Sequence, residues 1–582
     1  MANPPIRLGP GFFADGKARC LPVRPATFEA HSAEELEGLF QRVESHLARG
    51  GIAIGYVAFE AGRAWEPEPA PMPPGERLAW FALAQPEELG LDGPAPMEPE
   101  DGQFPVSVAW PSGEPLPENS WDSVRLALLD GITYQANLTG RVQVAVDLPP
   151  HRFYSRLLAS QNASFAAFLE TGDLTLLSLS PELFFKTSGD RIETQPMKGT
   201  APRGRFPRED QAIAEALRRD EKTLAENRMI VDLLRNDLGR LCVAGSVEVP
   251  HLFTLLPLST VWQMTSTIRG RLLPGTRLTE LFRALFPCGS VVGAPKLSTL
   301  ALLRTLEGRA RGPYCGAIGW ASAQEACFSV AIRTVEHDRR GYSMGVGSGL
   351  VEGSELEAER REWAHKTEFL GRDPTPFSLF TTLLWDGRHF PRRSLHKERL
   401  LASAAYFGFP ASGPHLEAAL DELEGTLPKN ETRRVRLTLS GDGQTAARAQ
   451  ELAPPLGNNL VRLAPERVSS GDPFLFHKTT RRDRWERWRV LAEKEDLADY
   501  LFLNERGELT EGTIHSLRVE LDGKILTPAL GCGLLPGILR QEGLDSGELT
   551  EAVLTPADLR RATRLWIGNA IRPWREVGVL WN

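Results

Sequence analysis

Two lysines stand out as residues that could do covalent chemistry, because lysine is rare in this chain. Arginine outnumbers lysine by 56 to 11 among the 67 basic residues of the 582-residue sequence. A lysine amine can lose its proton and attack carbon, whereas a guanidinium stays charged. Lys198 lies in the stretch PMKGT and Lys478 in the stretch HKTT. We therefore predict that these two amines act as nucleophiles or carry a covalently bound group.

Carboxylates at helical spacing form a second candidate group. Residues 210–238 contain no glycine or proline and predict one long helix, with Glu226 on the face of its apolar stripe. Residues 355–370 predict another helix, on which Glu359, Glu362 and Lys366 follow one another about a turn apart. Mg²⁺ takes carboxylates from proteins, so a metal site is one interpretation. A solvated, salt-bridged helix face is the alternative.

The composition fits a globular enzyme and excludes several other classes. A hydrophobic fraction of 42% and a charged fraction of 24% are ordinary for such proteins. The formal net charge of −8 leaves no basic excess for phosphates, so nucleic acid is not an expected partner. The first residues lack signal-peptide features, and no apolar run reaches the ~18 residues of a membrane span. Six scattered cysteines without CxxC spacing fit a reducing compartment, so we predict a cytoplasmic protein without a membrane partner.

The length requires more than one hydrophobic core, since single cores stop growing near about 250–300 residues. The clearest boundary is the stretch GRDPTP at 371–376, where a helical pattern ends and β-type runs restart. We predict an N-terminal region at 1–115, a catalytic domain at 116–371, a linker at 372–376 and a further domain at 377–582.

Four stretches of the first part carry a resemblance to a known family. They are YQANL (134–138), SPELFFKTSGDRIETQPMKGTAPRG (180–204), DEKTLAENRMIVDLLRNDLGR (220–240) and the segment from GPYCGAIGW to REWAHK (312–366). In this order they resemble the chorismate-binding enzymes, which include anthranilate, aminodeoxychorismate, isochorismate and salicylate synthases. The resemblance implies an α+β fold, a β-sandwich with flanking helices like that of anthranilate synthase component I.

The same resemblance implies roles in holding and activating chorismate. Glu226 and Glu362 become ligands of Mg²⁺, with Glu359 near the metal. Glu182 becomes the general acid that protonates the departing 4-hydroxyl group. The implied substrate contacts are the side chains of Arg333 and Lys366 as carboxylate clamps, the backbone at Gly316, Ala317, Gly347 and Gly349, and Gln135 at the position that selects the nucleophile.

Three positions favour the members of the family that aminate chorismate at C4. Lys198 stands where anthranilate synthases have alanine, and its amine can add to C2 before ammonia adds at C4. Gln135 replaces the lysine base of the water-using relatives, and Gln263 replaces a histidine that aids pyruvate loss in anthranilate synthases. The implied product is 4-amino-4-deoxychorismate. Because the sequence has no G-x-C-x-G nucleophile elbow followed by His-x-Glu, we expect a separate glutamine amidotransferase subunit to supply the ammonia.

A second resemblance covers residues 377–582. The stretches FTTLLWDG (380–387), LHKERLLASAAYFGF (395–409), HKTTRRDRW (477–485), LNERGELTEGTIHSL (503–517), GLLPGILR (533–540) and WIGNAIR (566–572) resemble fold-type IV pyridoxal 5'-phosphate enzymes, which have two α/β subdomains. The resemblance implies that Lys478 carries the cofactor, that Glu511 faces its ring nitrogen, and that this domain forms a homodimer. The other implied contacts are the Arg399 guanidinium, the amides of Ile538 and Leu539, and Asn569, while Thr382 is a candidate proton donor.

Two activities in one chain suggest consecutive steps. A lyase in the second part would consume the product of the first, release pyruvate and leave p-aminobenzoate for folate synthesis. Three alternatives stay open at this point. The first part could be an anthranilate or salicylate synthase, and the second part could be an amino-acid aminotransferase or an idle domain that docks the amidotransferase.

Overall fold

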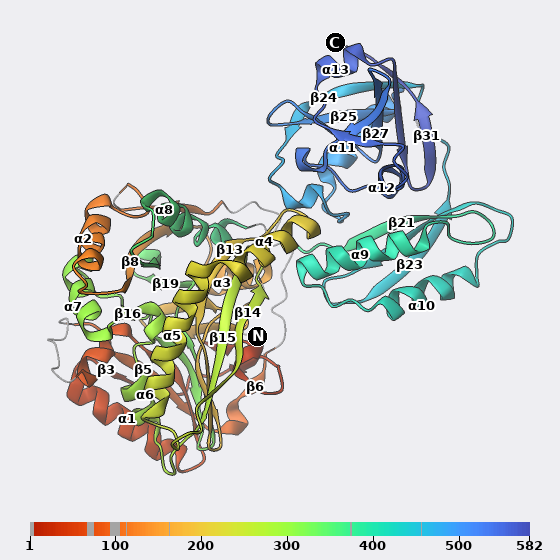
Figure 1. The fold of residues 1–582 in the computed structure, drawn as a ribbon. Helices are drawn as coiled ribbons and strands as arrows, with labels where there is room; N and C mark the ends of the chain where they lie inside the picture. The colour runs from red at the N-terminus through yellow and green to blue at the C-terminus, as the bar shows by residue number, and fades with distance from the viewer. Residues whose placement is uncertain are drawn as a thin grey trace. The chain divides into compact units, whose positions relative to one another are not determined.

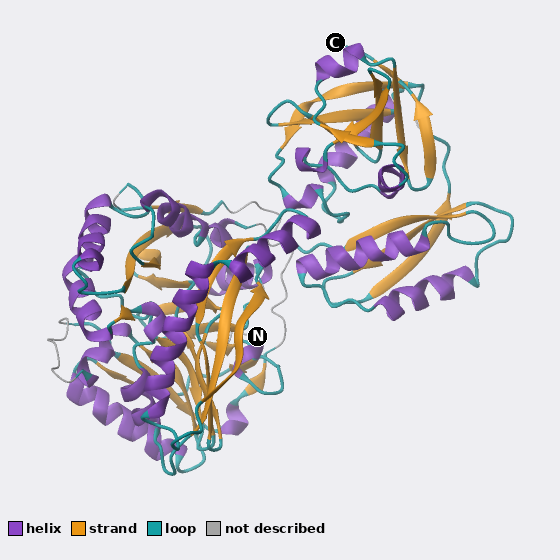
Figure 2. Cartoon of the chain, viewed as in Figure 1, coloured by secondary structure: helices purple, strands orange, loops and turns teal. Residues whose placement is uncertain are grey.

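The computed structural model describes residues 5–66, 75–92, 105–111, 113–161, 163–372, 375–455 and 457–581. The chain divides into two compact units, and each mixes helices with strands (Figures 1 and 2). The first unit comprises Met1–Pro202 and Ala216–Thr375, and the second comprises Arg203–Glu215 and Pro376–Asn582. Positions 373–374 of the predicted linker lie outside the described residues. No helix in the described ranges combines the length and the apolar composition that crossing a membrane requires.

Two antiparallel sheets of ten strands form the framework of the first unit. The first sheet contains, in spatial order, β16 (Gly293–Ala294), β8 (Gln135–Ala145), β20 (Gly341–Leu350), β19 (Thr334–Asp338), β10 (Thr175–Ser180), β9 (Phe165–Glu170), β1 (Ile6–Leu8), β2 (Arg19–Leu21) and β6 (Gly90–Leu91), with β7 (Ser107–Ala109) beside β8. The second contains β13 (Met197–Pro202), β15 (Val261–Arg271), β12 (Arg191–Gln195), β11 (Leu183–Ser188), β18 (Glu325–Val330), β17 (Ala317–Ala321), β4 (Ile52–Val57), β5 (Ala79–Ala84) and β3 (Ala26–Ala30), with β14 (Glu248–Pro257) beside β15.

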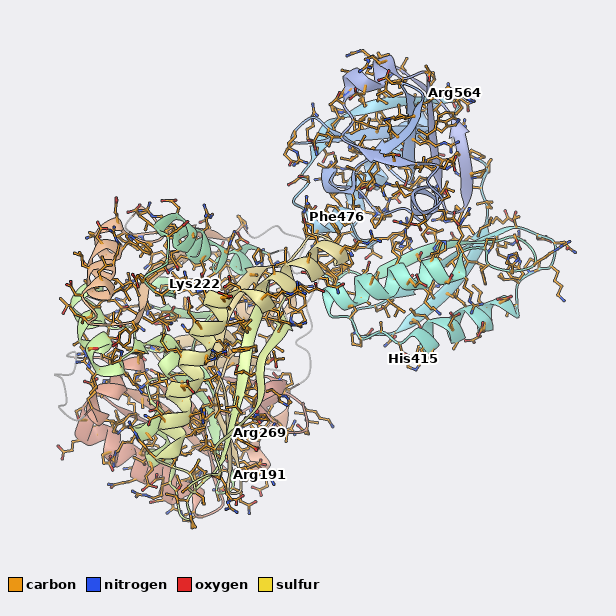
Figure 3. All side chains as sticks on the ribbon, viewed as in Figure 1. Arg191, Lys222, Arg269, His415, Phe476 and Arg564 are labelled. Atoms are coloured by element: carbon orange, nitrogen blue, oxygen red, sulfur yellow. The ribbon has the colours of Figure 1, made fainter. Side chains whose placement is uncertain are left out.

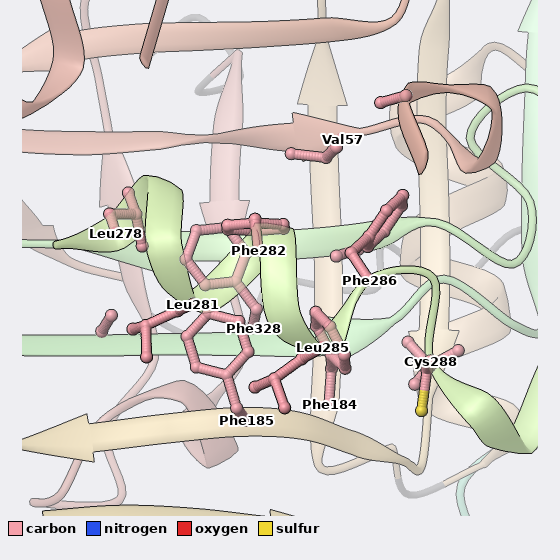
Figure 4. Close-up of a cluster of buried hydrophobic side chains, with 14 of the residues drawn as sticks. Val57, Phe184, Phe185, Leu278, Leu281, Phe282, Leu285, Phe286, Cys288 and Phe328 are labelled. Atoms are coloured by element: carbon pink, nitrogen blue, oxygen red, sulfur yellow. The ribbon is translucent and has the colours of Figure 1, made fainter. Parts of the chain in front are cut away.

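The two sheets pack against each other as a sandwich. One buried cluster joins Ile6 and Leu169 of the first sheet to Tyr56 and Ile318 of the second. Helices cover the other faces: α1 (Ala33–Leu47), α5 (Glu221–Gly239) and α6 (Leu278–Leu285) on the second sheet, and α2 (Glu118–Leu129), α3 (Pro150–Ser160), α7 (Lys296–Glu307) and α8 (Leu356–His365) on the first. Figure 4 shows Phe282 of α6 among the aromatic rings of the second sheet. The predicted sandwich with flanking helices is confirmed.

The prediction of one helix over 210–238 is wrong in one respect, because the structure has two helices there. α4 (Pro207–Arg219) ends before Asp220, and α5 starts after it. The Asp220 carboxylate accepts a hydrogen bond of 2.8 Å from the Thr223 amide, which caps the N-terminus of α5. Aspartate is more favourable at a helix N-cap than in a helix interior. Asp220 therefore explains the break, which a search for glycine and proline alone does not find. The second predicted helix is confirmed as α8, although it ends at His365.

The second unit contains two α/β subdomains, as predicted. In the first, β21 (Leu379–Trp385), β22 (Arg433–Leu439) and β23 (Thr445–Glu451) form a sheet that packs on α9 (Arg393–Phe407) and α10 (Gly413–Glu424). The other subdomain has its own core. Its elements are β24 (Leu460–Val468), β25 (Asp499–Asn504), β26 (Leu509–Gly512), β27 (Ser516–Leu521), β28 (Lys524–Pro528), β29 (Thr550–Ala552), β30 (Arg564–Asn569), β31 (Arg572–Glu576), β32 (Gly578–Val579), α11 (Asp483–Lys494), α12 (Ile538–Asp545) and α13 (Pro556–Arg561).

Candidate active sites

A cavity of about 290 Å³ in the first unit collects most of the residues predicted to act there. Strands β13 and β20 and helices α5 and α8 supply much of its wall, and Lys222, labelled in Figure 3, lines it from the first turn of α5. The predicted site residues that line it are Glu182, Lys198, Glu226, Arg333, Gly347, Gly349, Glu359, Glu362 and Lys366.

Lys198 is held in place by the packing of β13 against α5. The Asn227 side chain, one residue beyond Glu226, donates a hydrogen bond of 3.1 Å to the Lys198 carbonyl and accepts one of 2.6 Å from Ser266. The next residue, Gly199, has a φ of +99° and lies so close to Thr223 that a Cβ would come within 2.2 Å of its methyl group. Burial lowers the pKa of Lys198, which favours the neutral, nucleophilic amine.

Glu182 is a buried carboxyl that lines the same cavity as Lys198. It is 3% exposed, and its Oε1 accepts a hydrogen bond of 2.6 Å from the Ser290 hydroxyl. Burial raises the pKa of Glu182 to about 7, although Ser290 and Lys198 oppose the shift. A carboxyl with such a pKa can donate a proton near neutral pH.

Three carboxylates line the same cavity and repel one another electrostatically: Glu226, Glu359 and Glu362. Burial raises the pKa of Glu226 and of Glu359, and the neighbouring carboxylates add to both shifts. In the described part of the chain, no group of three His, Cys, Asp or Glu side chains is gathered closely enough to hold an ion as it stands. Glu362 is drawn instead to Lys366 Nζ at 2.6 Å, and Glu359 accepts a hydrogen bond from Ser348. The donor set nevertheless fits a hard divalent cation, which would relieve the repulsion.

Arg333 and Lys366 are cations that line the cavity. Arg333 lies in backbone with a φ of 49°, and burial lowers its pKa to about 10. The hydrogen bond that its side chain donates to Gln161 Oε1 is long, at 3.4 Å. Lys366 donates to the Gly347 carbonyl at 2.8 Å as well as to Glu362. A buried guanidinium with so weak a partner is poised for a carboxylate ligand.

Three predicted substrate contacts do not line this cavity. Gly316 and Ala317 lie just beyond Tyr314 and Cys315, which line it in their place. Gln135 is fully buried, and within the described residues neither polar atom of its amide has a hydrogen-bond partner. A Cβ built at Gly349 would lie 2.6 Å from the Gln135 amide nitrogen and 2.9 Å from Lys198 Nζ, so the two side chains flank this glycine.

A second cavity of about 290 Å³ lies within the second unit. The predicted residues that line it are Thr382, Arg399, Lys478, Glu511, Ile538 and Asn569. Leu539 is buried in α12 and is not part of the lining. Lys478 is the only lysine among the lining residues described, and burial, reinforced by Arg482 and Arg399, lowers its pKa well below the usual value.

Other residues of this cavity suit a phosphorylated pyridine. Burial raises the pKa of Glu511 to about 7, and its Oε1 accepts a hydrogen bond of 3.1 Å from the Leu535 amide. Gly537 caps the N-terminus of α12, and a Cβ there would lie 2.4 Å from the Ser516 hydroxyl. Buried Arg399, with its pKa lowered to about 10 by burial, lines the same cavity. A lysine, a carboxyl for the ring nitrogen and an anion cradle thus converge, which fits pyridoxal 5'-phosphate.

A buried carboxylate holds the loop that follows Glu511. Asp499 Oδ1 accepts hydrogen bonds from the Thr513 amide at 3.0 Å and from the Thr513 hydroxyl at 2.6 Å. Asp499 Oδ2 pairs with His515 Nδ1 at 2.7 Å, and Gly512 leaves room for this contact. Arg482 donates to the Thr513 carbonyl at 2.6 Å. The position of Glu511 therefore depends in part on Asp499 and His515, which do not line the cavity.

Comparisons with known proteins follow the same division of the chain. Residues 118–372 match the family model of the chorismate binding enzymes. Aminodeoxychorismate synthase component 1 of Klebsiella aerogenes is 33% identical over 341 residues, which are 54% of this chain and 76% of that protein. The chain belongs to the chorismate-binding enzyme family. Anthranilate synthase component 1 of Saccharolobus solfataricus, which is 32% identical over 56% of this chain and 80% of that protein, is another relative.

Other relatives of this chorismate-binding enzyme match only in part. It is 36% identical to aminodeoxychorismate synthase of Streptomyces pristinaespiralis over 351 residues. The matched segment covers 58% of this chain but 47% of that protein. It thus spans about half the length of that relative. The crystal structure of anthranilate synthase component I from Streptococcus pneumoniae superposes with a TM-score of 0.50 at 26% identity, covering 64% of this chain and 91% of that one. Residues 378–579 match a second family model, the class IV amino-transferases.

Several lining residues of the chorismate-binding unit escaped the sequence analysis. Ser290 and Val291 lie between two proline-containing stretches, and Asn137 lies inside the YQANL motif itself. A signal was present for Tyr314 and Cys315, since both belong to the GPYCGAIGW motif. The contact of Ser290 with the site is seen only in the structure, where its hydroxyl donates a hydrogen bond of 2.6 Å to Glu182. No sequence pattern predicts this contact.

Proposed function

We propose that the chain makes p-aminobenzoate from chorismate in two steps, the first in the cavity around Lys198 and the second in the cavity around Lys478. The observation that carries the proposal is a buried Lys198 amine, whose pKa is lowered by burial, in one cavity with Glu182 and Glu226. Amination at C4 by two successive displacements needs such an amine, whereas direct amination at C2 does not.

In the first step the Lys198 amine adds to C2 of the ring, and the 4-hydroxyl group leaves as water after taking a proton from Glu182. Ammonia then adds at C4, the bond between Lys198 and C2 breaks, and the ring double bonds return to their places. The proton that the new ammonium group loses returns to Glu182. The sum is chorismate plus ammonia giving 4-amino-4-deoxychorismate plus water.

Charged groups of the cavity would hold the substrate during these displacements. Glu226 and Glu362, with Glu359 near, would bind Mg²⁺, which supplies positive charge for the ring carboxylate. Arg333 would bind the other carboxylate of the substrate. Lys366 would bind that carboxylate too, once Glu362 binds the metal and no longer pairs with Lys366.

Glu226→Ala and Glu362→Ala should each lower chorismate consumption by about a hundredfold or more, because each removes a metal ligand. Steady-state rates at several Mg²⁺ concentrations measure the effect. The cofactor absorbance of the second unit should stay unchanged, since that cavity uses other residues. Glu357→Ala is the matched control, because Glu357 lies on α8, pairs with Arg360 and does not line the cavity. Full activity of either active-site variant in EDTA would show that the metal assignment is wrong.

The rate of the first step should fall as pH rises through about 7, the pKa to which burial raises Glu182. The sign follows from its role, since only the protonated carboxyl can donate to the leaving hydroxyl group. The measurement is chorismate consumption against pH at a constant concentration of unprotonated ammonia. Glu182→Gln should lose this dependence together with most of the activity. A wild-type rate that does not decline between about pH 6 and about pH 9 contradicts the role.

In the second step the cofactor, when bound, supplies an electron sink for elimination. Lys478 would hold it, Glu511 would keep its ring nitrogen protonated, and Arg399 with the N-terminus of α12 would bind its phosphate. The Lys478 amine, displaced by the substrate amine, would take the proton from C4 of the ring. Thr382 would give a proton to the departing enolpyruvate as its bond to the ring breaks. The products are pyruvate and p-aminobenzoate.

Two partners belong to the proposal. Relatives from Salmonella typhimurium and Escherichia coli are named component 1, which implies a second component, and a glutamine amidotransferase would supply the ammonia. A second copy of the chain would pair through the cofactor unit, as fold-type IV enzymes do.

An amino-acid aminotransferase is the second candidate for residues 378–579, because the matching family model is that of the class IV amino-transferases. Purified full-length protein with cofactor would be given either 4-amino-4-deoxychorismate or an amino acid with 2-oxoglutarate. We expect pyruvate release from the first at a kcat/KM at least about a hundredfold above any transamination. The opposite ratio would favour the aminotransferase, and no turnover of either by cofactor-loaded protein would leave a docking domain.

A further inference from the structure

One face of the small sheet in the second unit is lined with arginine. In β22, Val435, Leu437 and Leu439 are fully buried in the core under α9 and α10. Because side chains alternate along a strand, Arg434 and Arg436 point to the opposite face. Both line the cavity that contains Lys478.

The register of the sheet brings like charges together on this face. Arg436 pairs directly with Arg448 of β23. Like charges at directly opposed positions destabilise a sheet. Within the described residues, neither the Arg434 nor the Arg436 side chain has a hydrogen bond or an ion pair. The Arg436 guanidinium lies over the Phe380 ring, 3.8 Å from its centre. Burial and the charge of Arg434 lower the pKa of Arg436, so the site gains from an added anion.

The charges of the cavity wall also favour the binding of an added anion. Six arginines and Lys478 line it against three glutamates. The lining residues are Arg399, Arg434, Arg436, Arg482, Arg489 and Arg572, and Glu451, Glu486 and Glu511. A phosphorylated cofactor brings roughly two negative charges at neutral pH. Positive charge therefore remains on the cavity wall after the cofactor binds.

We propose that Arg434 and Arg436 form a carboxylate subsite, and that the second unit therefore selects a substrate with two carboxylates over one with a single carboxylate. The inference rests on the proposed function and names the feature that a substrate of this site must have. Arg436 stands directly opposite Thr382 in the register of β21 and β22. A carboxylate on Arg436 would thus lie beside the residue that gives its proton to the leaving enolpyruvate.

Two simple aromatic acids test the subsite without turnover. Isophthalate carries two carboxylates and benzoate carries one, and neither has an amine that could displace Lys478. Each would be titrated into the full-length protein loaded with cofactor, at low ionic strength and without chorismate. The readout is the absorbance band of the cofactor, which reports on the second unit alone. We expect isophthalate to bind about tenfold to a hundredfold more tightly than benzoate.

Arg436→Gln and Arg434→Gln should bring the two affinities to within about threefold of each other and keep the cofactor band. Arg448→Gln is the matched control, since it removes the same charge from the same face but does not line the cavity; it should preserve the preference for isophthalate. Equal affinities in the wild type, or an undiminished preference in Arg436→Gln, overturn the subsite. Such a result combined with normal p-aminobenzoate formation leaves the proposed function standing, whereas a wild type without a cofactor band overturns both.

Discussion

Replacing Lys478 with alanine should abolish p-aminobenzoate formation while chorismate is still consumed. Lys478 is the only lysine among the described residues of its cavity, and burial with Arg482 and Arg399 lowers its pKa well below that of a free lysine. No neighbouring amine can take over its attachment to the cofactor or its proton transfer. We expect the second step to slow on the order of a thousandfold or more. The aminated intermediate should accumulate, and chromatography of the reaction mixture measures it.

Attachment itself can be mapped in the same experiment. Borohydride reduction of the wild type should place the pyridoxyl group on the peptide that contains Lys478. Lys494→Ala is the matched control, because Lys494 lies exposed on α11 and does not line the cavity. Pyridoxyl on another lysine, or undiminished p-aminobenzoate from Lys478→Ala, contradicts the assignment.

Replacing Lys198 should abolish the covalent addition to C2, and the proposal that the first reaction aminates chorismate at C4 depends on this addition. Wild type incubated with chorismate and Mg²⁺ in the absence of ammonia should gain the mass of the dehydrated substrate on the peptide that contains Lys198. Lys198→Ala should lose this adduct and the synthase rate on the order of a thousandfold. Remaining turnover would come from direct addition of ammonia at C2, as in anthranilate synthases.

The arginine variant separates a nucleophile from a mere charge. Lys198→Arg keeps the positive charge but cannot attack carbon, so it should be as inactive as Lys198→Ala. Lys186→Ala is the control, since Lys186 pairs with Glu193 outside the cavity and should keep full activity. Near-normal product from Lys198→Arg would require the covalent mechanism to be dropped.

The sequence predicted a residue of the cavity correctly where one motif contains both that residue and the strand that carries it. PMKGT predicts Lys198, and β13 presents it to the cavity because Gly199 permits the close approach of α5. It was less informative where a turn decides which neighbour faces inward. Gly316 and Ala317 were expected at the anion, but Cys315 adopts a φ of 63°, and Tyr314 and Cys315 line the cavity instead.

The second unit shows a different limit of sequence reasoning. Lys478 and Glu511 are 33 positions apart in the sequence, and the motif order alone predicted that they lie in one site, as the shared cavity shows. The residues that hold Glu511 were not, because Asp499 lies on a separate strand and acts through Thr513 and His515. Arg434 and Arg436 read as ordinary surface charge until the register of β22 places them on the cavity wall.

One product analysis tests the central claim, that a single chain carries chorismate to p-aminobenzoate. Purified protein would be given chorismate, Mg²⁺ and ammonium, with and without pyridoxal 5'-phosphate. With the cofactor we predict p-aminobenzoate and pyruvate in equal amounts. Without it we predict 4-amino-4-deoxychorismate and no pyruvate. Anthranilate as the main product, or the same products irrespective of the cofactor, would contradict the account.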